Sequence, residues 1–199
     1  IGVHTGNLSN RLINKKSKKK YLLVLKSLLK GCQLLKKSKS KFIVIPCNTA
    51  HYWYDDLIKK IKLPIINMPK EVFNHTVKKC KINSTIGLLA TEGTLRTGVY
   101  SKFFDKKYNL IFPNNLLQKK SVNRAIKFVK MGNVKSANKI IKPAIDYLMK
   151  KKCKKIILGC TELPIAIFAF KSFQKIKKSK MFLDPNLILA VSSMKKYRV

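Results

Sequence analysis

Two short segments decide the fold of this 199-residue chain. The first, Phe42-Ile-Val-Ile-Pro-Cys47-Asn-Thr49, is an apolar run that ends in a cysteine followed by amide and hydroxyl side chains. The second, Ile156-Ile-Leu-Gly-Cys160-Thr-Glu162, repeats that pattern in the other half of the chain. Short apolar runs of this kind are typical of buried parallel strands. Each cysteine is therefore expected just past the carboxyl end of a strand, which is the edge where open α/β sheets bind ligands.

Strands and helices are expected to alternate along the rest of the chain. The apolar patterns predict strands over 42–46, 64–67, 85–89, 110–112, 156–158 and 181–183. They predict helices over 21–37, 55–61, 71–80, 97–106, 121–131, 134–151, 164–170 and 186–196, and Pro143 is expected to kink or divide the helix that contains it.

This alternation predicts an α/β fold with parallel sheets and helices on both faces of each sheet. Because the cysteine segment occurs once in each half, we expect two similar three-layer αβα lobes that face each other across a cleft. The first lobe is expected to comprise residues 1–80 together with 185–199, and to carry Cys47. The second is expected to comprise residues 81–184 and to carry Cys160.

The net charge is unusual. The chain has 44 Lys and Arg residues against 8 Asp and Glu, which gives a formal charge of +36. Such a charge normally indicates a nucleic-acid or membrane partner. Only four of the basic residues are arginines, however, and the lysines are scattered in short runs among many Ile and Asn residues. This pattern favours a solvated surface that drifted in an A+T-rich genome, so a nucleic-acid partner is not expected.

The cysteines indicate a reducing compartment. There are five, no CxxC pair occurs, and residues 1–11 lack the apolar core of a signal peptide. The longest apolar stretch, 156–170, is too short for a membrane span. We therefore expect a cytoplasmic protein without a membrane anchor or a structural zinc site. Three of the cysteines lie in lysine-rich surroundings and are expected only to pack: Cys32, Cys80 and Cys153.

Cys47 and Cys160 have polar neighbours and are expected to be reactive. The start of a helix stabilises a thiolate through the helix dipole and its unpaired N–H groups. Two thiols on opposing lobes suit a reaction that needs one base on each face of a carbon, namely deprotonation at Cα from one side and reprotonation from the other. The neighbouring Asn48, Thr49 and Thr161 can bind a carboxylate together with backbone donors.

At this point the chain resembles a known family. Pro46-Cys-Asn-Thr-Ala-His51 and Leu158-Gly-Cys-Thr-Glu-Leu-Pro164 resemble the paired cysteine signatures of the aspartate/glutamate racemase superfamily. Gly87-Leu-Leu-Ala-Thr-Glu-Gly-Thr94, with Gly98-Val-Tyr100 after it, resembles the middle strand and loop of the aspartate racemase branch. Glutamate racemases usually have His where this chain has Glu162. The resemblance therefore favours an aspartate racemase or a broad amino-acid racemase.

The resemblance implies a racemase that needs no cofactor, binds a small amino acid such as aspartate, and is usually a homodimer. It gives Cys47 and Cys160 the roles of opposed acid and base. Arg11 and Lys130 are the nearest matches to the residues that bind the side-chain carboxylate in aspartate racemases. Glu162 is counted with the substrate-binding set, although it and His51 directly follow the cysteines and could instead orient them or cap helices. The remaining substrate-binding residues implied are Asn48, Thr49, Thr91, Thr94 and Thr161.

The resemblance weakens at the start of the chain. Family members begin with a strand and a glycine-rich loop, which residues 1–14 do not supply. The first lobe is therefore expected to lack its opening strand and to expose a sheet edge, as in a fragment or the product of a decaying gene. Two alternatives to a racemase stay open. One is another isomerase or a decarboxylase acting on a small dicarboxylate; the other is an inactive basic protein that binds nucleic acid.

Overall fold

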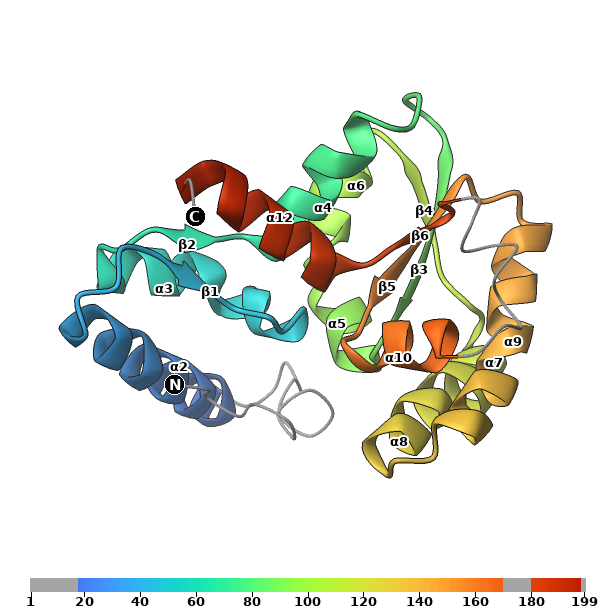
Figure 1. The fold of residues 1–199 in the computed structure, drawn as a ribbon, viewed down its shortest axis with the longest axis horizontal. Helices are drawn as coiled ribbons and strands as arrows, with labels where there is room; N and C mark the ends of the chain where they lie inside the picture. Colours follow the sequence, from blue (N-terminus) through green and yellow to red (C-terminus); the bar gives the residue numbers. More distant parts are fainter. Residues whose placement is uncertain (1–17, 170–179, 198–199) are drawn as a thin grey trace.

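The computed structural model describes residues 18–169 and 180–197, in which the strands form two parallel groups (Figure 1). The larger sheet has the order β4-β3-β5-β6 and the smaller group is the pair β1-β2. The strands are β1 (Ile43–Val44), β2 (Ile65–Ile66), β3 (Thr85–Ala90), β4 (Asn109–Ile111), β5 (Lys155–Gly159) and β6 (Phe182–Leu183). Every pair is parallel, so the expected α/β class with two groups of parallel strands is confirmed.

The two central strands of the larger sheet are buried on both faces. β3 and β5 run in register up to the pair Ala90–Gly159, directly before the polar loops that follow each strand. At Gly159 the strands and their side chains approach so closely that an added Cβ would lie 2.8 Å from Leu88 Cδ1 and 3.1 Å from Ala90 Cβ. The absence of a side chain at Gly159 therefore allows β3 and β5 to pack closely at the edge that carries Cys160.

Helices cover both faces of the larger sheet. One face packs against α8 (Arg124–Lys130), α9 (Val134–Lys150) and α10 (Glu162–Phe168), and its core contains Leu89, Ile156 and Leu158. The other face uses the alternate residues Ile86, Leu88 and Ile157, as the period of two in a strand requires. This second core also contains side chains from α4 (Met68–Val77), α6 (Ser101–Phe104) and α12 (Pro185–Tyr197).

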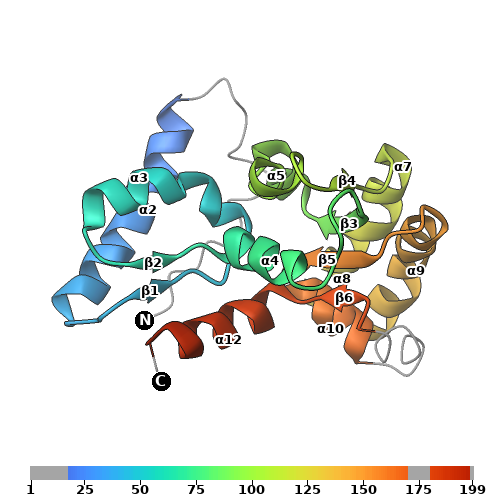
Figure 2. The same ribbon diagram turned by 90° about the horizontal axis from the view of Figure 1, so that it is seen from above.

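The smaller group packs mainly against the first helices of the described chain. These are α2 (Lys18–Lys37), the 3₁₀ helix η1 (Thr49–Trp53) and α3 (Tyr54–Ile61), which share a buried cluster with Ile43 and Ile65. α12 leaves the larger sheet, runs beside α4 and reaches this group, where Tyr197 stacks on Phe42 (Figures 1 and 2). The exact division into lobes at residues 80 and 185 stays a prediction.

One expected helix was wrong in its bounds, and another is not divided by its proline. The helix expected over 97–106 is instead α5 (Glu92–Thr97) followed by α6, because Gly98 adopts a left-handed conformation (φ +63°) and ends α5. Pro143 does not divide α9, which continues from Val134 to Lys150. The proline removes one backbone hydrogen bond, but Ile141, Ala144 and Ile145 around it are fully buried and hold the helix against the sheet.

The segment expected as a helix over 121–131 also begins earlier. It starts with α7 (Asn115–Leu117), passes through the π-helical turn η2 (Gln118–Asn123) and continues as α8. The helix expected over 164–170 is α10, and residue 170 lies outside the described residues. No helix in residues 18–169 and 180–197 is long and apolar enough to cross a bilayer.

Candidate active site

Three buried threonines join the two groups of strands. Thr49 begins η1, shortly after β1, whereas Thr91 and Thr94 lie at the start of α5, after β3. The Thr49 and Thr94 hydroxyl oxygens are 2.7 Å apart, and the Thr91 hydroxyl lies 3.1 Å from that of Thr94. Thr91 also accepts a hydrogen bond from the Thr94 N–H (3.2 Å) and so caps α5. The structure therefore brings together three of the residues predicted for one site from loops 42 positions apart in sequence.

Cys47 lies shortly after β1, beyond Ile45 and Pro46, and is half-buried. Its backbone is held by His51, whose buried ring lies between the Cys47 carbonyl (2.9 Å from Nδ1) and the Met68 N–H, which donates to Nε2 (3.0 Å). Since Nε2 accepts, Nδ1 carries the proton and donates to Cys47. Burial lowers the pKa of His51, which keeps this ring neutral.

Asn48 is almost completely buried next to Cys47, and a residue that packs on the larger sheet holds its side chain by a hydrogen bond. The Tyr100 hydroxyl, at the start of α6, donates a 2.5 Å hydrogen bond to its Oδ1. Burial raises the pKa of Tyr100 well above its ordinary value, and the nearby Asp184 carboxylate and Cys160 sulfur add to this effect, so the phenol is neutral and keeps the proton it donates. Tyr100 thus lies near both cysteine segments.

Cys160 lies between β5 and α10 and is buried. Its Sγ–H donates to Glu162 Oε2 (2.9 Å), and the Thr161 hydroxyl donates to the same oxygen (2.9 Å). Lys130, the last residue of α8, places its Nζ 3.6 Å from Glu162 Oε1. These four predicted residues therefore form one connected cluster.

The electrostatics of this cluster favour a protonated thiol. Burial raises the pKa of Cys160 well above its ordinary value and the Glu162 carboxylate raises it further, whereas the backbone N–H of Glu162 and the charge of Lys130 only partly oppose this. For Glu162, burial alone would raise the pKa, but hydrogen bonds from Cys160 and Thr161, together with the charge of Lys130, outweigh it and lower the value. At neutral pH the pair is therefore a thiol beside a carboxylate.

Two residues near the site carry no role from the sequence. Tyr100 appears in a quoted motif, but nothing in that motif shows that its hydroxyl reaches Asn48. Gln118 is buried and donates to the Ala90 carbonyl at the end of β3 (2.9 Å) and to Asn123 (2.8 Å), which in turn donates to Glu92. It therefore supports the loop that carries Thr91. Because Gln118 reaches this place from a π-helical turn, hydrophobic periodicity gives no signal for it.

The remaining cysteines pack in hydrophobic clusters, and one predicted residue falls outside the described residues. Cys32 and Cys153 are buried and Cys80 is half-buried, and none of the five cysteines forms a disulfide. Arg11 lies outside the described residues. Within residues 18–169 and 180–197, no three His, Cys, Asp or Glu side chains converge as they would around a metal ion.

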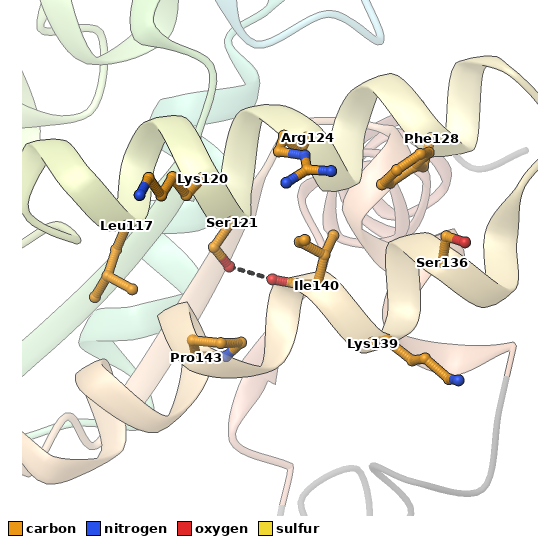
Figure 3. Close-up of a pocket in the computed structure, with 9 residues that line it drawn as sticks. All are labelled: Leu117, Lys120, Ser121, Arg124, Phe128, Ser136, Lys139, Ile140 and Pro143. Atoms are coloured by element: carbon orange, nitrogen blue, oxygen red, sulfur yellow. Dashed lines mark hydrogen bonds between the residues drawn. The ribbon is translucent and has the colours of Figure 1, made fainter.

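Two cavities in the described part of the chain are lined by no cysteine. One, of about 430 Å³, lies between η2–α8 and α9, where Arg124 packs over the Phe128 ring and Ser121 bridges to the Ile140 carbonyl (Figure 3). The other, of about 370 Å³, lies between β1 and α12. None of the predicted site residues lines either cavity.

Comparison with proteins of known sequence identifies similar chains. The chain is 23% identical over 175 residues to the broad specificity amino-acid racemase RacX of Bacillus subtilis, covering 86% of this chain and 71% of RacX. It is 28% identical over 127 residues to a glutamate racemase of Oceanobacillus iheyensis, covering 63% of this chain and 45% of that enzyme. The chain thus spans about half the length of that glutamate racemase.

Solved structures share the fold. The aspartate racemase of Picrophilus torridus superposes with a TM-score of 0.69 at 24% identity, covering 86% of this chain and 68% of that one. A glutamate racemase of Francisella tularensis, solved in complex with D-glutamate, superposes with a TM-score of 0.62 at 22% identity, covering 89% and 65%. At these identities the likeness supports the fold alone.

The family itself is shown by a match over most of the chain. The sequence model described as Asp/Glu/Hydantoin racemase matches residues 10–192, which include both cysteine segments and the threonine loop. This chain therefore belongs to the aspartate/glutamate/hydantoin racemase family.

Proposed function

We propose that this chain is an amino-acid racemase that interconverts L- and D-aspartate by proton transfer through Cys47 and Cys160. The observation that carries the proposal is the placement of both cysteines just past the carboxyl ends of parallel strands, each beside polar side chains, in a member of a racemase family. The sequence model matches a racemase family, and relatives with racemase names span most of the chain, which favours this reaction over a decarboxylase.

The proposed reaction is two linked proton transfers. One cysteine, as thiolate, takes the α-proton, and the electron pair of the broken C–H bond stays on Cα, delocalised into the α-carboxylate. The other cysteine, as thiol, donates its proton to the opposite face, which forms the new C–H bond and inverts the centre. Each sulfur then has the protonation state with which the other began, and exchange with solvent restores the first state. No step needs a cofactor.

The remaining predicted residues would hold the substrate. The hydroxyls of Thr49, Thr91 and Thr94 and the amide of Asn48 offer hydrogen bonds to the α-carboxylate and the ammonium group. Thr161 belongs to the same proposed set, next to the second cysteine. Arg11 and Lys130 would bind the side-chain carboxylate of aspartate, for which Lys130 offers a cation at the end of α8.

Broad specificity is the second candidate, and a particular contact favours it. Lys130 already faces an internal carboxylate, Glu162, so its charge is partly compensated before any substrate binds. A side-chain pocket with little net charge would accept neutral amino acids as well as aspartate. The name of the similar Bacillus subtilis protein, a broad specificity racemase, points the same way.

The test is exchange of the α-hydrogen in D₂O, followed by NMR, with L- and D-aspartate, glutamate, neutral amino acids and dicarboxylates that lack an amino group. We expect exchange and racemisation with aspartate, and a loss of at least about 100-fold in Cys47→Ala and Cys160→Ala, the low end of what a positioned acid or base supplies. Cys80→Ala, distant from the loops, is the matched control and should stay active. Undiminished exchange in the two cysteine variants would contradict the proposal.

We also propose that the chain acts as a homodimer, as the family resemblance implies, and in the cytoplasm, as its free cysteines indicate. Sedimentation of the purified protein measures its mass in solution directly. A concentration-independent monomer with full activity would contradict the dimer without affecting the proposed reaction.

A further inference from the structure

We propose that Glu162 is a positioning residue that holds Cys160 as a protonated thiol, so that Cys160 begins the cycle as the acid and Cys47 as the base. This inference rests on the proposed racemase function and assigns different resting states to its two cysteines. It also moves Glu162 from the substrate-binding set, where the sequence placed it, to the control of a catalytic sulfur.

The hydrogen bond itself places the proton. Glu162 Oε2 lies 2.9 Å from Cys160 Sγ, and the same oxygen also accepts from the Thr161 hydroxyl. An ionised carboxylate has only acceptors, so the proton of the first bond belongs to sulfur. The second bond and the nearby Lys130 ammonium stabilise the ionised form of Glu162 and keep it in this role.

Removing that proton would be costly. A Cys160 thiolate would place a second negative charge beside the Glu162 carboxylate, in a position where the sulfur is buried from solvent. Like charges at such a distance in a buried site strongly disfavour the doubly ionised state. A neutral histidine in the position of Glu162 would not impose this cost.

The other groups that face Cys160 do not reverse this balance. Lys130, from α8, favours the thiolate, but its side chain is 44% exposed and its charge is therefore screened. Tyr100, from the start of α6, is neutral. Asp184, before α12, is close enough to affect Tyr100 and adds negative charge to the same region. Burial and the Glu162 carboxylate together therefore keep the thiol protonated at rest, and among the charged groups Glu162 has the largest effect.

The primary experiment measures the protonation of the thiol and needs no activity. The rate of alkylation by iodoacetamide is followed against pH, and peptide mass spectrometry reports Cys160 and Cys47 separately in one sample. In Glu162→Gln we expect Cys160 to react at lower pH, with about a tenfold higher rate at neutral pH. Cys47 is the internal control and should keep its profile.

Two further variants distinguish charge from packing. Glu162→Asp keeps the carboxylate and should retain most of the wild-type profile of Cys160. Lys130→Gln removes the opposing charge and should move the reaction of Cys160 to higher pH, the opposite direction to Glu162→Gln. A Cys160 profile that is unchanged in Glu162→Gln, or that moves in the same direction in both variants, would overturn the inference, provided circular dichroism shows that the variants are folded.

The kinetic readout separates this inference from the proposed function. If Cys160 is the resting acid, the fall of kcat/KM at high pH reports the loss of its proton and should move to lower pH in Glu162→Gln. Because the two enantiomers are equally stable, kcat/KM must change equally for both. If the protein racemises aspartate but the pH dependence of Cys160 alkylation is the same in Glu162→Gln as in wild type, only the role of Glu162 is overturned. If that pH dependence moves to lower pH but the protein racemises none of the amino acids, the role of Glu162 is supported and the proposed function is contradicted.

Discussion

At the residue scale, His51 supports the loop that carries Cys47 and makes the folding stability depend on pH. Its buried ring is neutral and joins the Cys47 carbonyl to the Met68 N–H. Burial lowers its pKa in the folded state, whereas the unfolded chain has an ordinary value of about 6.5. Above that pH the residue is neutral in both states. Below about pH 6.5 the His51 ring binds a proton in the unfolded chain but stays neutral in the folded chain, so folding stability is lost as the pH falls.

We therefore predict that the free energy of unfolding decreases below about pH 6.5, with a contribution from His51 of up to about 1.4 kcal/mol per pH unit. Urea unfolding between pH 7.5 and pH 5 measures this slope. His51→Gln, whose amide can accept from Met68, should show a smaller slope than wild type. His75→Asn is the comparison: because the pKa of His75 is also lowered, this variant should reduce the slope too, but by less than His51→Gln, since His75 is less buried. Equal slopes for wild type and His51→Gln would contradict the assignment.

A second residue-scale prediction concerns Gly159. A methyl group at this position would lie 2.8 Å from Leu88 Cδ1 and 3.2 Å from the Leu89 carbonyl, in a fully packed strand pair. Gly159→Ala should therefore destabilise the protein by about 1–3 kcal/mol, as overpacking in a core does. Thermal or urea unfolding measures the change. Wild-type stability in this variant would mean that β3 and β5 can separate without cost.

At the scale of elements, the cysteine-bearing strands were predictable because each lies in a continuous apolar run, as parallel strands do. β5 is buried on both faces, whereas β1 buries Ile43 and leaves Val44 exposed. The break at Gly98 was not predictable, because a single left-handed residue ends α5 inside an otherwise helical pattern. The continuity of α9 through Pro143 was also missed, since packing against the sheet outweighs one lost hydrogen bond. The hydrogen bond from Tyr100 to Asn48 depends on where α6 starts relative to η1, and a local sequence pattern does not predict that distance.

The contact between α6 and η1 gives a prediction at this scale. Tyr100→Phe removes the donor to Asn48 and leaves a buried carbonyl oxygen without it, which should cost about 1–3 kcal/mol of stability. With Asn48 less well oriented, we also expect kcat/KM for racemisation to fall by about tenfold or more. Tyr108→Phe is the matched control, because its hydroxyl bonds the Cys80 carbonyl elsewhere. Equal activities in the two variants would show that Tyr100 does not position Asn48.

At the scale of the whole molecule, the repeated cysteine segment was sufficient to predict two groups of parallel strands. How those groups meet was not predictable from the residues alone, because the threonine hydroxyl contacts depend on the distance between loops from different sheets. The resemblance to a family grouped these threonines into one site, but only the structure shows that they contact one another. The limits of the lobes and the role of Arg11 stay predictions.

The charge of the whole chain gives the last prediction. A protein of +36 attracts an anionic substrate over a distance that salt shortens to about 10 Å at 0.1 M. For aspartate, kcat/KM should therefore decrease as potassium chloride is added, whereas for a neutral amino acid it should change little. Initial rates at subsaturating substrate between 0.02 and 0.5 M salt, roughly the range over which screening becomes strong, measure this. An equal salt dependence for both substrates would show that the lysines do not attract the substrate.

The threonine hydroxyls have a consequence for handedness. In the contacts among Thr49, Thr91 and Thr94 either oxygen can be the donor, so the whole group can reverse the direction of its hydrogen bonds by rotating hydrogens alone. A fixed N–H group has one direction and suits one arrangement of a ligand. A racemase must hold two mirror-image molecules in one cleft, and hydroxyl rotors allow it to do so without moving a heavy atom.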